Sequence, residues 1–199
     1  AERGIDCRFG EPVVRIDRAN RIVFSNAGGV PYNKLLIATG SAPFIIPVAG
    51  KDLKGVLAYR DIADTQAMID AAKTYQHAVV IGGGLLGLEA ANGLMKRGMQ
   101  VSVVHVAPWL MERQLDDVAG KLLQKSLEER GMKFLIGAQT QELVGDEDDG
   151  KGGRVKAIRF KDGTELPADL LVMAVGIRPN TALAESMRLH VNKGIVVSD

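Results

Sequence analysis

The stretch VVIGGGLLGLE, residues Val79–Glu89, decides the fold of this chain. Its first three residues are aliphatic, as in a strand that is buried on both faces of a parallel sheet. The spacing Gly82-x-Gly84-x-x-Gly87 follows at once, and a helical pattern of apolar residues begins where the glycines end. A strand, a glycine-rich turn and a helix in this order predict the start of a dinucleotide-binding unit.

Each glycine in this spacing has a separate physical task. Gly82 permits a tight turn, Gly84 lets the backbone approach a pyrophosphate without an intervening side chain, and Gly87 lets the helix pack close to the strand. Free amide groups at the start of the helix, together with the helix dipole, favour a bound phosphate. The predicted nucleotide-binding segment comprises Gly82, Gly83, Gly84, Leu85, Leu86 and Gly87.

The alternation of strands and helices continues beyond this segment. Val101–Val106 is predicted as the next strand, Asp116–Arg130 as a second helix that Asp116 caps, and Phe134–Ile136 as a third strand. This order is typical of a parallel sheet with right-handed crossover connections. We therefore predict an α/β fold with a Rossmann-like parallel sheet.

An antiparallel β-meander is predicted to follow the parallel unit. Its strands are Thr140–Val144 and Arg154–Phe160, and Asp162-Gly163 is a strong two-residue hairpin turn. Leu170–Val175 is predicted as a further buried strand. The acidic loop Gly145–Gly153 lacks the alternating ligands of a calcium loop, so we expect no metal site there.

The residues before the dinucleotide motif are predicted to form a hairpin, a strand and a connection. Val13–Ile16 and Arg21–Ser25 alternate as hairpin strands, a Gly28-Gly29 loop follows them, and Leu35–Ala38 has the composition of a short buried strand. Prolines and glycines over Ser41–Gly55 indicate a connection between domains.

The composition excludes several classes of protein. The chain has 199 residues, 46% of them hydrophobic, and its 25 basic and 24 acidic side chains give a net charge of +1. Without a basic cluster, nucleic acid is not an expected partner. No apolar run approaches the roughly 20 residues of a spanning helix, so no membrane is expected. The single cysteine, Cys7, excludes an internal disulfide and suits a cytoplasmic protein.

The residue expected to bind the adenosine ribose departs from the usual pattern. Dinucleotide-binding units carry an acidic residue about 20 positions after the motif, whereas here His105 stands at the end of the second predicted strand. A neutral imidazole can accept a hydrogen bond from a ribose hydroxyl, and a protonated one can contact a 2′-phosphate. The alternative is an ordinary solvent-facing strand end. Because no Arg or Lys follows until Arg113, the sequence favours NAD(H) over NADP(H).

Three separated motifs occur in a characteristic order: LLIATGS at Leu35–Ser41, VVIGGGLLGLE at Val79–Glu89 and AVGIRPN at Ala174–Asn180. Together they resemble the FAD-dependent pyridine nucleotide-disulfide oxidoreductase superfamily. More narrowly, the chain resembles the large subunit of assimilatory NAD(P)H-dependent nitrite reductases. The segments that carry this narrower resemblance are Tyr32–Ser41, Gly87–Leu94 and Val104–Asp116.

The resemblance implies a flavin domain that a nicotinamide-nucleotide domain interrupts. Residues 1–46, with the hairpin and the ATG strand, would be part of the FAD-binding domain, and residues 47–76 a connection and a helix over about Asp61–Thr74. Residues 77–180 would form the NAD(H)-binding domain, and residues 181–199 would begin the return to the FAD domain. The family's flavin fingerprint and its later Gly-Asp motif are not in the sequence. The chain therefore resembles an excised piece, which we expect to be inactive alone.

The resemblance also implies roles for individual residues. In this family a hydride passes from NADH to FAD, and the glutamate that matches Glu89 lies near both rings. Glu89 and Arg60 have the alternative of being ordinary surface residues. The other implied cofactor-binding residues are Ala174, Val175, Gly176 and Ile177 at the nicotinamide ribose, Thr39 and Gly40 at the flavin nucleotide, and Arg60 beside the flavin.

Three functions stay open at this point. In the first, the chain is the NADH-binding part of a nitrite reductase large subunit, whose siroheme and iron-sulfur cluster lie in the parent outside this chain. Its partners would be NADH, FAD, the remainder of the parent polypeptide and a small nitrite reductase subunit. In the second, it belongs to a ferredoxin- or rubredoxin-type NADH reductase. In the third, it is a nucleotide-binding sensor or scaffold without electron transfer.

Overall fold

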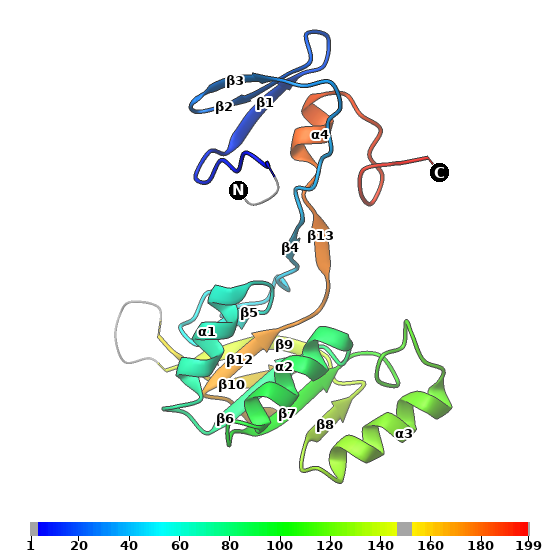
Figure 1. Ribbon diagram of the computed structural model, residues 1–199. Helices are drawn as coiled ribbons and strands as arrows, with labels where there is room; N and C mark the ends of the chain where they lie inside the picture. Colours follow the sequence, from blue (N-terminus) through cyan, green and yellow to red (C-terminus); the bar gives the residue numbers. More distant parts are fainter. Residues whose placement is uncertain (1–3, 147–152, 199) are drawn as a thin grey trace. The chain divides into compact units, whose positions relative to one another are not determined.

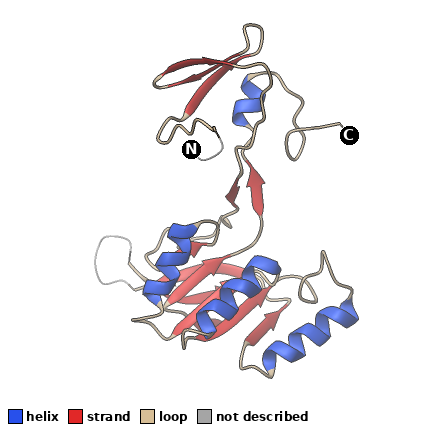
Figure 2. Cartoon of the chain, in the orientation of Figure 1, coloured by secondary structure: helices blue, strands red, loops and turns tan. Residues whose placement is uncertain are grey.

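The computed structural model describes residues 4–146 and 153–198 of the chain. They form two compact units, one made of the residues up to Ala42 together with those from Ile177 on, and one that runs from Pro43 to Gly176. Figure 1 shows the order of the elements along the chain, and Figure 2 shows that the larger unit layers helices on a sheet.

The larger unit is built on a five-stranded parallel sheet, which confirms the predicted α/β class. Each strand pairs with its neighbour in parallel, and β6 lies at the centre. Ala78 to Ile81 of β6 are all buried, as expected of a strand that is covered on both faces. The strands, in spatial order, are β5 (Val56–Ala58), β12 (Leu170–Met173), β6 (His77–Ile81), β7 (Gln100–His105) and β8 (Lys133–Ile136).

Two separate apolar layers cover the faces of this sheet. On one face, Val80 and Val103 pack with Leu94 of helix α2 (Leu85–Met95). On the other face, Val79 packs with Ile158 of a three-stranded antiparallel sheet. Alternate residues of β6 therefore serve the two cores, as the period of two in a strand requires. The antiparallel sheet is the predicted meander, with strands β9 (Thr140–Gly145), β10 (Val155–Phe160) and β11 (Glu165–Pro167).

Two helices begin after aspartate caps, of which the sequence predicted Asp116. Helix α1 (Ile62–Ala71) begins after Asp61, whose side chain accepts a hydrogen bond from the backbone amide of Asp64 in a capping box. Helix α3 (Asp117–Glu128) begins after Asp116, which accepts a hydrogen bond from the amide of Ala119. Both helices are shorter than predicted, because their last residues form turns.

Strand β6 lies at a topological switch point. From β6 the chain proceeds to β7 and β8 on one side, whereas β12 and β5 lie on its other side. Open parallel sheets bind ligands at such a point, outside the carboxyl ends of the strands. The segments that follow β6, β7, β8 and β12 are therefore the place to look for a site.

The smaller unit contains a meander in place of the predicted hairpin and loop. Strands β1 (Val13–Asp17), β2 (Ile22–Ser25) and β3 (Gly28–Pro31) pair antiparallel in that order. The prediction of a Gly28-Gly29 loop is wrong, because both residues pair with β2. A Cβ at Gly29 would lie 3.0 Å from Ile22 Cγ2, so the glycine leaves room for close packing across the strands. The unit also contains helix α4 (Ala182–Ser186), strand β13 (Ile177–Pro179) and the first two residues of its partner strand β4 (Ser41–Pro43).

The predicted buried strand over Leu35–Ala38 is also wrong. This segment forms no strand, and the Leu36 side chain is 88% exposed. An apolar run becomes a strand only where another strand offers hydrogen bonds, and none of the described residues offers them here. The chain is instead held just beyond this run, where Thr39 Oγ1 donates to the carbonyl of Asn180 at 2.7 Å.

Two other expectations concern the residues around the sheet. Residues 47–76, expected as a connection and a helix, also contain strand β5, which extends the parallel sheet. The acidic loop expected to hold no metal falls largely on residues 147–152, which lie outside the described residues. Among the helices of the described ranges, none has the length and apolar character needed to cross a membrane.

Candidate functional site

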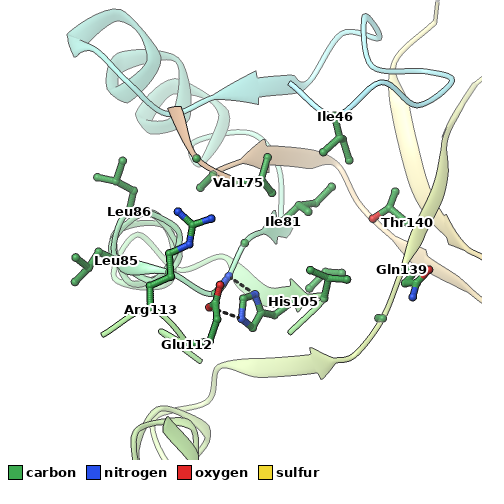
Figure 3. Close-up of a pocket in the computed structure, with 18 of the residues that line it drawn as sticks. Ile46, Ile81, Leu85, Leu86, His105, Glu112, Arg113, Gln139, Thr140 and Val175 are labelled. Carbon is green, nitrogen blue, oxygen red and sulfur yellow. Dashed lines mark hydrogen bonds and ion pairs between the residues drawn. The ribbon is translucent and has the colours of Figure 1, made fainter. Parts of the chain in front are cut away.

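A pocket of about 560 Å³ opens at the carboxyl ends of the parallel strands. All of the residues that line it belong to the larger unit, and Figure 3 shows several of them around the end of β6. Most of them come from the carboxyl ends of β6, β7, β8 and β12 and the segments that follow, the positions that the switch point indicates. The lining residues are Ile46, Val48, Ile81–Leu86, Val104–Val106, Glu112–Gln114, Ala138–Thr140, Lys161 and Ala174–Gly176.

Two glycines of the motif are required by the protein itself. Gly82 has φ +117°, a conformation that side chains rarely adopt, and a Cβ there would overlap the carbonyl oxygen of Ala174. A Cβ at Gly87 would overlap the carbonyl oxygen of Gly82. These two positions therefore allow the β6–α2 turn and its close packing against the segment after β12.

Gly84 differs from its neighbours, because no contact with residues 4–146 or 153–198 requires it to be a glycine. A Cβ at Gly84 would meet no heavy atom within 4 Å, and its φ of −87° suits any residue. Gly84 is the N-cap of α2 and has no side chain to bond the first amides of the helix. The open space above Gly84 therefore faces free N–H groups at the positive end of the α2 dipole, the features of an anion site.

The remaining glycine, Gly83, is packed against the side chains that follow β7. A Cβ there would lie 2.6 Å from Leu110 Cδ2 and 2.8 Å from His105 Cγ, and both of these side chains are buried. The backbone of Gly83 is bonded in both directions, since its amide donates to His105 Nδ1 at 3.0 Å and its carbonyl accepts from the amide of Met111 at 3.0 Å. The glycine turn and the segment after β7 are thus joined into one wall of the pocket.

The hydrogen bond from Gly83 fixes the tautomer of His105. A backbone amide can only donate, so Nδ1 must hold a lone pair and the ring proton must lie on Nε2. Nε2 then donates to the carbonyl oxygen of Trp109 at 3.0 Å and to Glu112 Oε2 at 3.1 Å. Both ring nitrogens are engaged by the protein, and the residue is only 6% exposed. His105 is a buried connector, in contrast to the solvent-facing strand end of the sequence alternative.

Two cations and one carboxylate line the pocket. Arg113 and Lys161 each contribute a side chain for which no hydrogen bond or ion pair occurs within residues 4–146 and 153–198. Glu112 contributes its carboxylate, which is 34% exposed and is held by His105. Figure 3 shows Arg113 extending toward Leu86 and Val175, away from His105. The Glu112 carboxylate therefore lies beside the end of β7, and the Arg113 side chain lies toward the segment after β12.

The pocket brings together most of the predicted nicotinamide-nucleotide contacts. Nine of them line it, namely Gly82, Gly83, Gly84, Leu85, Leu86, His105, Ala174, Val175 and Gly176. The last three follow β12, where the amide of Ala174 donates to the carbonyl of Ile81 and the carbonyl of Gly176 accepts from Phe44. Gly87 lies buried beneath the turn and does not line the pocket.

Glu89 lies outside this pocket. It is an exposed residue on α2, and its negative charge acts on Tyr59, the residue that follows β5. Partial burial and the nearby Glu89 carboxylate together raise the pKa of Tyr59 above its ordinary value of 10.0. Arg60, the next residue along the chain, is exposed, and its backbone amide donates to Asp64 Oδ2 at 2.7 Å. The carboxyl end of β5 therefore gathers two of the residues that the family resemblance indicates.

The other three predicted residues belong to the smaller unit. Thr39 and Gly40 are exposed, and the amide of Asn180 donates to the carbonyl of Gly40 at 2.9 Å. Ile177 is 48% exposed at the start of β13. Hydrogen bonds of Thr39 and Gly40 with Asn180 hold their segment in place.

Sequence reasoning missed several residues of the pocket wall. Glu112, Arg113 and Lys161 lie in loops, far along the chain from the glycine motif. No spacing rule places them, since their positions depend on the turn after β7 and on the β10–β11 hairpin. The one usable signal was the presence of Glu112 in the loop that follows the unusual His105.

Comparison with known proteins places the chain among flavin and nicotinamide enzymes. The family model described as pyridine nucleotide-disulphide oxidoreductase matches residues 1–199. A nitrite reductase [NAD(P)H] of Bacillus subtilis is 55% identical over 199 residues, which is 100% of this chain and 24% of that protein. An assimilatory nitrate reductase electron transfer subunit of the same organism is 44% identical over 100% of this chain and 25% of its own length. The chain thus spans about a quarter of the length of these curated relatives.

A solved structure supports the same grouping. The crystal structure of a ferredoxin reductase from Rhodopseudomonas palustris superposes with a TM-score of 0.87 at 30% sequence identity. The match covers 94% of this chain and 45% of the reductase.

Proposed function

The chain belongs to the pyridine nucleotide-disulphide oxidoreductase family, and from this premise we propose that it is the NAD(P)H-binding part of a flavin-dependent oxidoreductase. The observation that carries the proposal is Gly84, which is open to the pocket and leaves the first amides of α2 free. These amides would hold the pyrophosphate of the nucleotide. Arg113, which lines the same pocket, would supply a positive charge for it.

The nicotinamide half is assigned to the segment after β12 and to the nearby helix. Ala174, Val175 and Gly176 line the pocket on the side away from β7, so they would contact the nicotinamide ribose, together with Ile177. Glu89 would lie beside the reacting rings, as the family resemblance implies. When bound, NADH supplies a hydride from C4 of its nicotinamide to the flavin, and the protein supplies orientation and electrostatics.

FAD is assigned to contacts that the resemblance implies. Thr39 and Gly40 would close over the flavin nucleotide. Both residues are exposed, and hydrogen bonds with Asn180 hold their segment in place. Arg60 would lie beside the flavin. We keep the predicted domain limits as part of this proposal, with residues 77–180 as the nucleotide domain and residues 1–46 and 181–199 as portions of the flavin domain.

For the whole protein we propose the large subunit of a nitrite reductase. The similarity to the Bacillus subtilis nitrite reductase over all 199 residues supports this assignment. The remainder of the parent polypeptide and a small nitrite reductase subunit would then be its partners, and siroheme and an iron-sulfur cluster would lie outside this chain. The single cysteine supports a reducing, cytoplasmic setting.

A second candidate is a reductase that passes electrons to a ferredoxin or rubredoxin. The similarity to the ferredoxin reductase of Rhodopseudomonas palustris favours it. The reading frame of the parent gene separates the two candidates. A continuation into cysteine-rich, siroheme-binding sequence supports the nitrite reductase, whereas an end about two hundred residues after Asp199 supports the smaller reductase.

Titration of the chain with NADH tests nucleotide binding directly. Trp109 is the only tryptophan, and its carbonyl oxygen accepts a hydrogen bond from His105 in the pocket wall. We expect saturable quenching of Trp109 fluorescence, or energy transfer from it to the nicotinamide, with the same affinity by calorimetry. Absence of binding by both methods would contradict the proposal.

Electron transfer is tested separately, in the flavin-loaded parent protein. We expect Glu89→Ala to slow flavin reduction by NADH while leaving the dissociation constant of NADH within about threefold of wild type, because Glu89 lies outside the nucleotide pocket. An unchanged reduction rate would favour a nucleotide-binding sensor or scaffold.

A further inference from the structure

We propose that Glu112 binds the adenosine ribose and makes this site select NADH over NADPH. The inference rests on the proposed function, since it concerns the same nucleotide pocket. Such sites ordinarily use an acidic residue at the end of the second strand, and this chain has His105 there. The structure places another carboxylate, that of Glu112, 3.1 Å from the His105 ring, seven residues further along the chain.

The carboxylate of Glu112 is held in place through its contact with His105. Its Oε2 atom accepts from His105 Nε2 at 3.1 Å, and His105 Nδ1 in turn accepts from the amide of Gly83. The glycine turn at the phosphate site and the carboxylate are therefore connected through one rigid, buried ring. Such a connection fixes the separation between a bound pyrophosphate and the group that would receive the ribose.

The second carboxylate oxygen of Glu112 is free to bind a ligand. Within the described part of the chain, Oε1 of this side chain takes part in no hydrogen bond, and the side chain lines the pocket with 34% of its surface exposed. A carboxylate accepts hydrogen bonds from vicinal hydroxyls, which are the donors that the 2′ and 3′ positions of NADH present. NADPH carries a 2′-phosphate in place of the 2′-hydroxyl, and the negative charges of this phosphate and of the Glu112 carboxylate would repel each other.

The neighbouring arginine does not offset this repulsion. Figure 3 shows Arg113 directed away from Glu112 and His105, toward Leu86 at the start of α2. Leu86 belongs to the first turn of α2, whose free amides form the proposed pyrophosphate site. The pocket thus has its carboxylate on the ribose side and its arginine on the phosphate side, an arrangement that suits NADH.

The test compares dissociation constants of NADH and NADPH for the chain and two variants, measured by calorimetry. Glu112→Gln removes the charge and keeps an oxygen that can accept from His105. We expect the preference for NADH to fall by about tenfold or more, because a charged hydrogen bond is lost and the repulsion of the 2′-phosphate disappears. Glu129→Gln removes an equal charge at the end of α3, outside the pocket, and should leave the preference unchanged.

The outcomes separate this inference from the proposed function. If the wild-type chain binds NADH and Glu112→Gln leaves the NADH preference unchanged, the assignment of Glu112 is overturned and nucleotide binding stands. A wild-type preference for NADPH also overturns it. If the wild-type chain binds neither nucleotide, the proposed function itself fails, and the inference fails with it.

A double-mutant cycle tests the positioning role of His105. His105→Asn retains an acceptor near the Nδ1 position for Gly83 and loses the Nε2 arm that holds Glu112. We expect it to reduce the NADH preference in the wild-type background and to have little further effect when Glu112→Gln is already present. Equal effects in both backgrounds would show that His105 supports only the fold, and would contradict this role.

Discussion

The backbone amide of Gly83 lies 3.0 Å from Nδ1 of His105, and it donates a hydrogen bond to that nitrogen. This contact joins the glycine turn after β6 to the end of β7, two strands that are neighbours in the sheet. It also explains why Gly83 is packed tightly, since its Cα faces the imidazole ring. One hydrogen bond thus connects the motif that defines the fold with the loop that forms the pocket wall.

This contact predicts the tautomer of His105. Because the Gly83 amide occupies Nδ1 as a donor, the neutral ring should carry its proton on Nε2, where Trp109 and Glu112 accept it. Two-bond proton–nitrogen NMR spectra of the labelled chain report this directly, with His77 and His190 as internal references. A proton found on Nδ1 would show that the Gly83 contact is not made in solution.

Replacement of Gly83 by alanine should destabilise the protein. The added Cβ would lie 2.6 Å from Leu110 Cδ2 and 2.8 Å from His105 Cγ, and both of these side chains are buried. We expect Gly83→Ala to lower the free energy of unfolding by about 1–3 kcal/mol, the usual range for overpacking. Urea denaturation measures it, with Gly84→Ala as the matched control, because a Cβ at Gly84 meets no atom within 4 Å. Equal stabilities of the two variants would contradict the packing at Gly83.

Replacement of Gly84 by valine should remove nucleotide binding and spare the fold. The side chain would project into the space assigned to the pyrophosphate, while the backbone at Gly84 suits any residue. We expect no measurable NADH binding and a free energy of unfolding within about 1 kcal/mol of wild type. Gly93→Ala, on the same helix and also in open space, should keep wild-type affinity. Wild-type affinity in Gly84→Val would remove the basis of the proposed function.

The carboxylate of Asp169 should make the free energy of unfolding decrease as the solution becomes acidic. Its Oδ2 atom accepts from the amides of Gln76 at 3.2 Å and His77 at 2.8 Å, where β6 begins. Burial raises the pKa of Asp169, but hydrogen bonds from the His77 and Gln76 amides and from the His77 ring outweigh it, so the pKa lies below its ordinary value of 3.8. The contribution of the carboxylate is therefore fully present above about pH 4 and is lost as the pH falls through the folded-state pKa.

The corresponding variant is Asp169→Asn. We expect it to be less stable than wild type at about pH 7 by about 1 kcal/mol or less, since the side chain is partly exposed, with a smaller difference at about pH 3. Urea denaturation at both pH values measures this, and Asp52→Asn, at an exposed carboxylate paired with Lys51, is the control. A difference that grows in acid would contradict the assigned direction.

The parallel sheet could be predicted because its signals are local. Runs of aliphatic residues, a capping residue such as Asp116, and the glycine spacing each specify an element through its own neighbours in the chain. The failures are of another kind. Leu35–Ala38 has the composition of a strand but lacks a pairing partner among the described residues, and Gly28-Gly29 has the composition of a loop but pairs with β2. Strand pairing is a long-range property, so composition alone cannot decide it.

The sequence by itself determined the order of strands and helices from β6 to β8, the turn at Gly82–Gly87 and the kind of ligand that this turn suits, because the signals for these elements lie in adjacent residues. Tertiary structure alone decided which side chains surround the pocket. It buried His105, which the sequence left open as a ribose contact, and brought the carboxylate of Glu112 to the end of β7. The physical reason is that a parallel sheet gathers loops from distant parts of the chain at one edge, where contacts follow from packing and hydrogen bonding and not from spacing along the sequence.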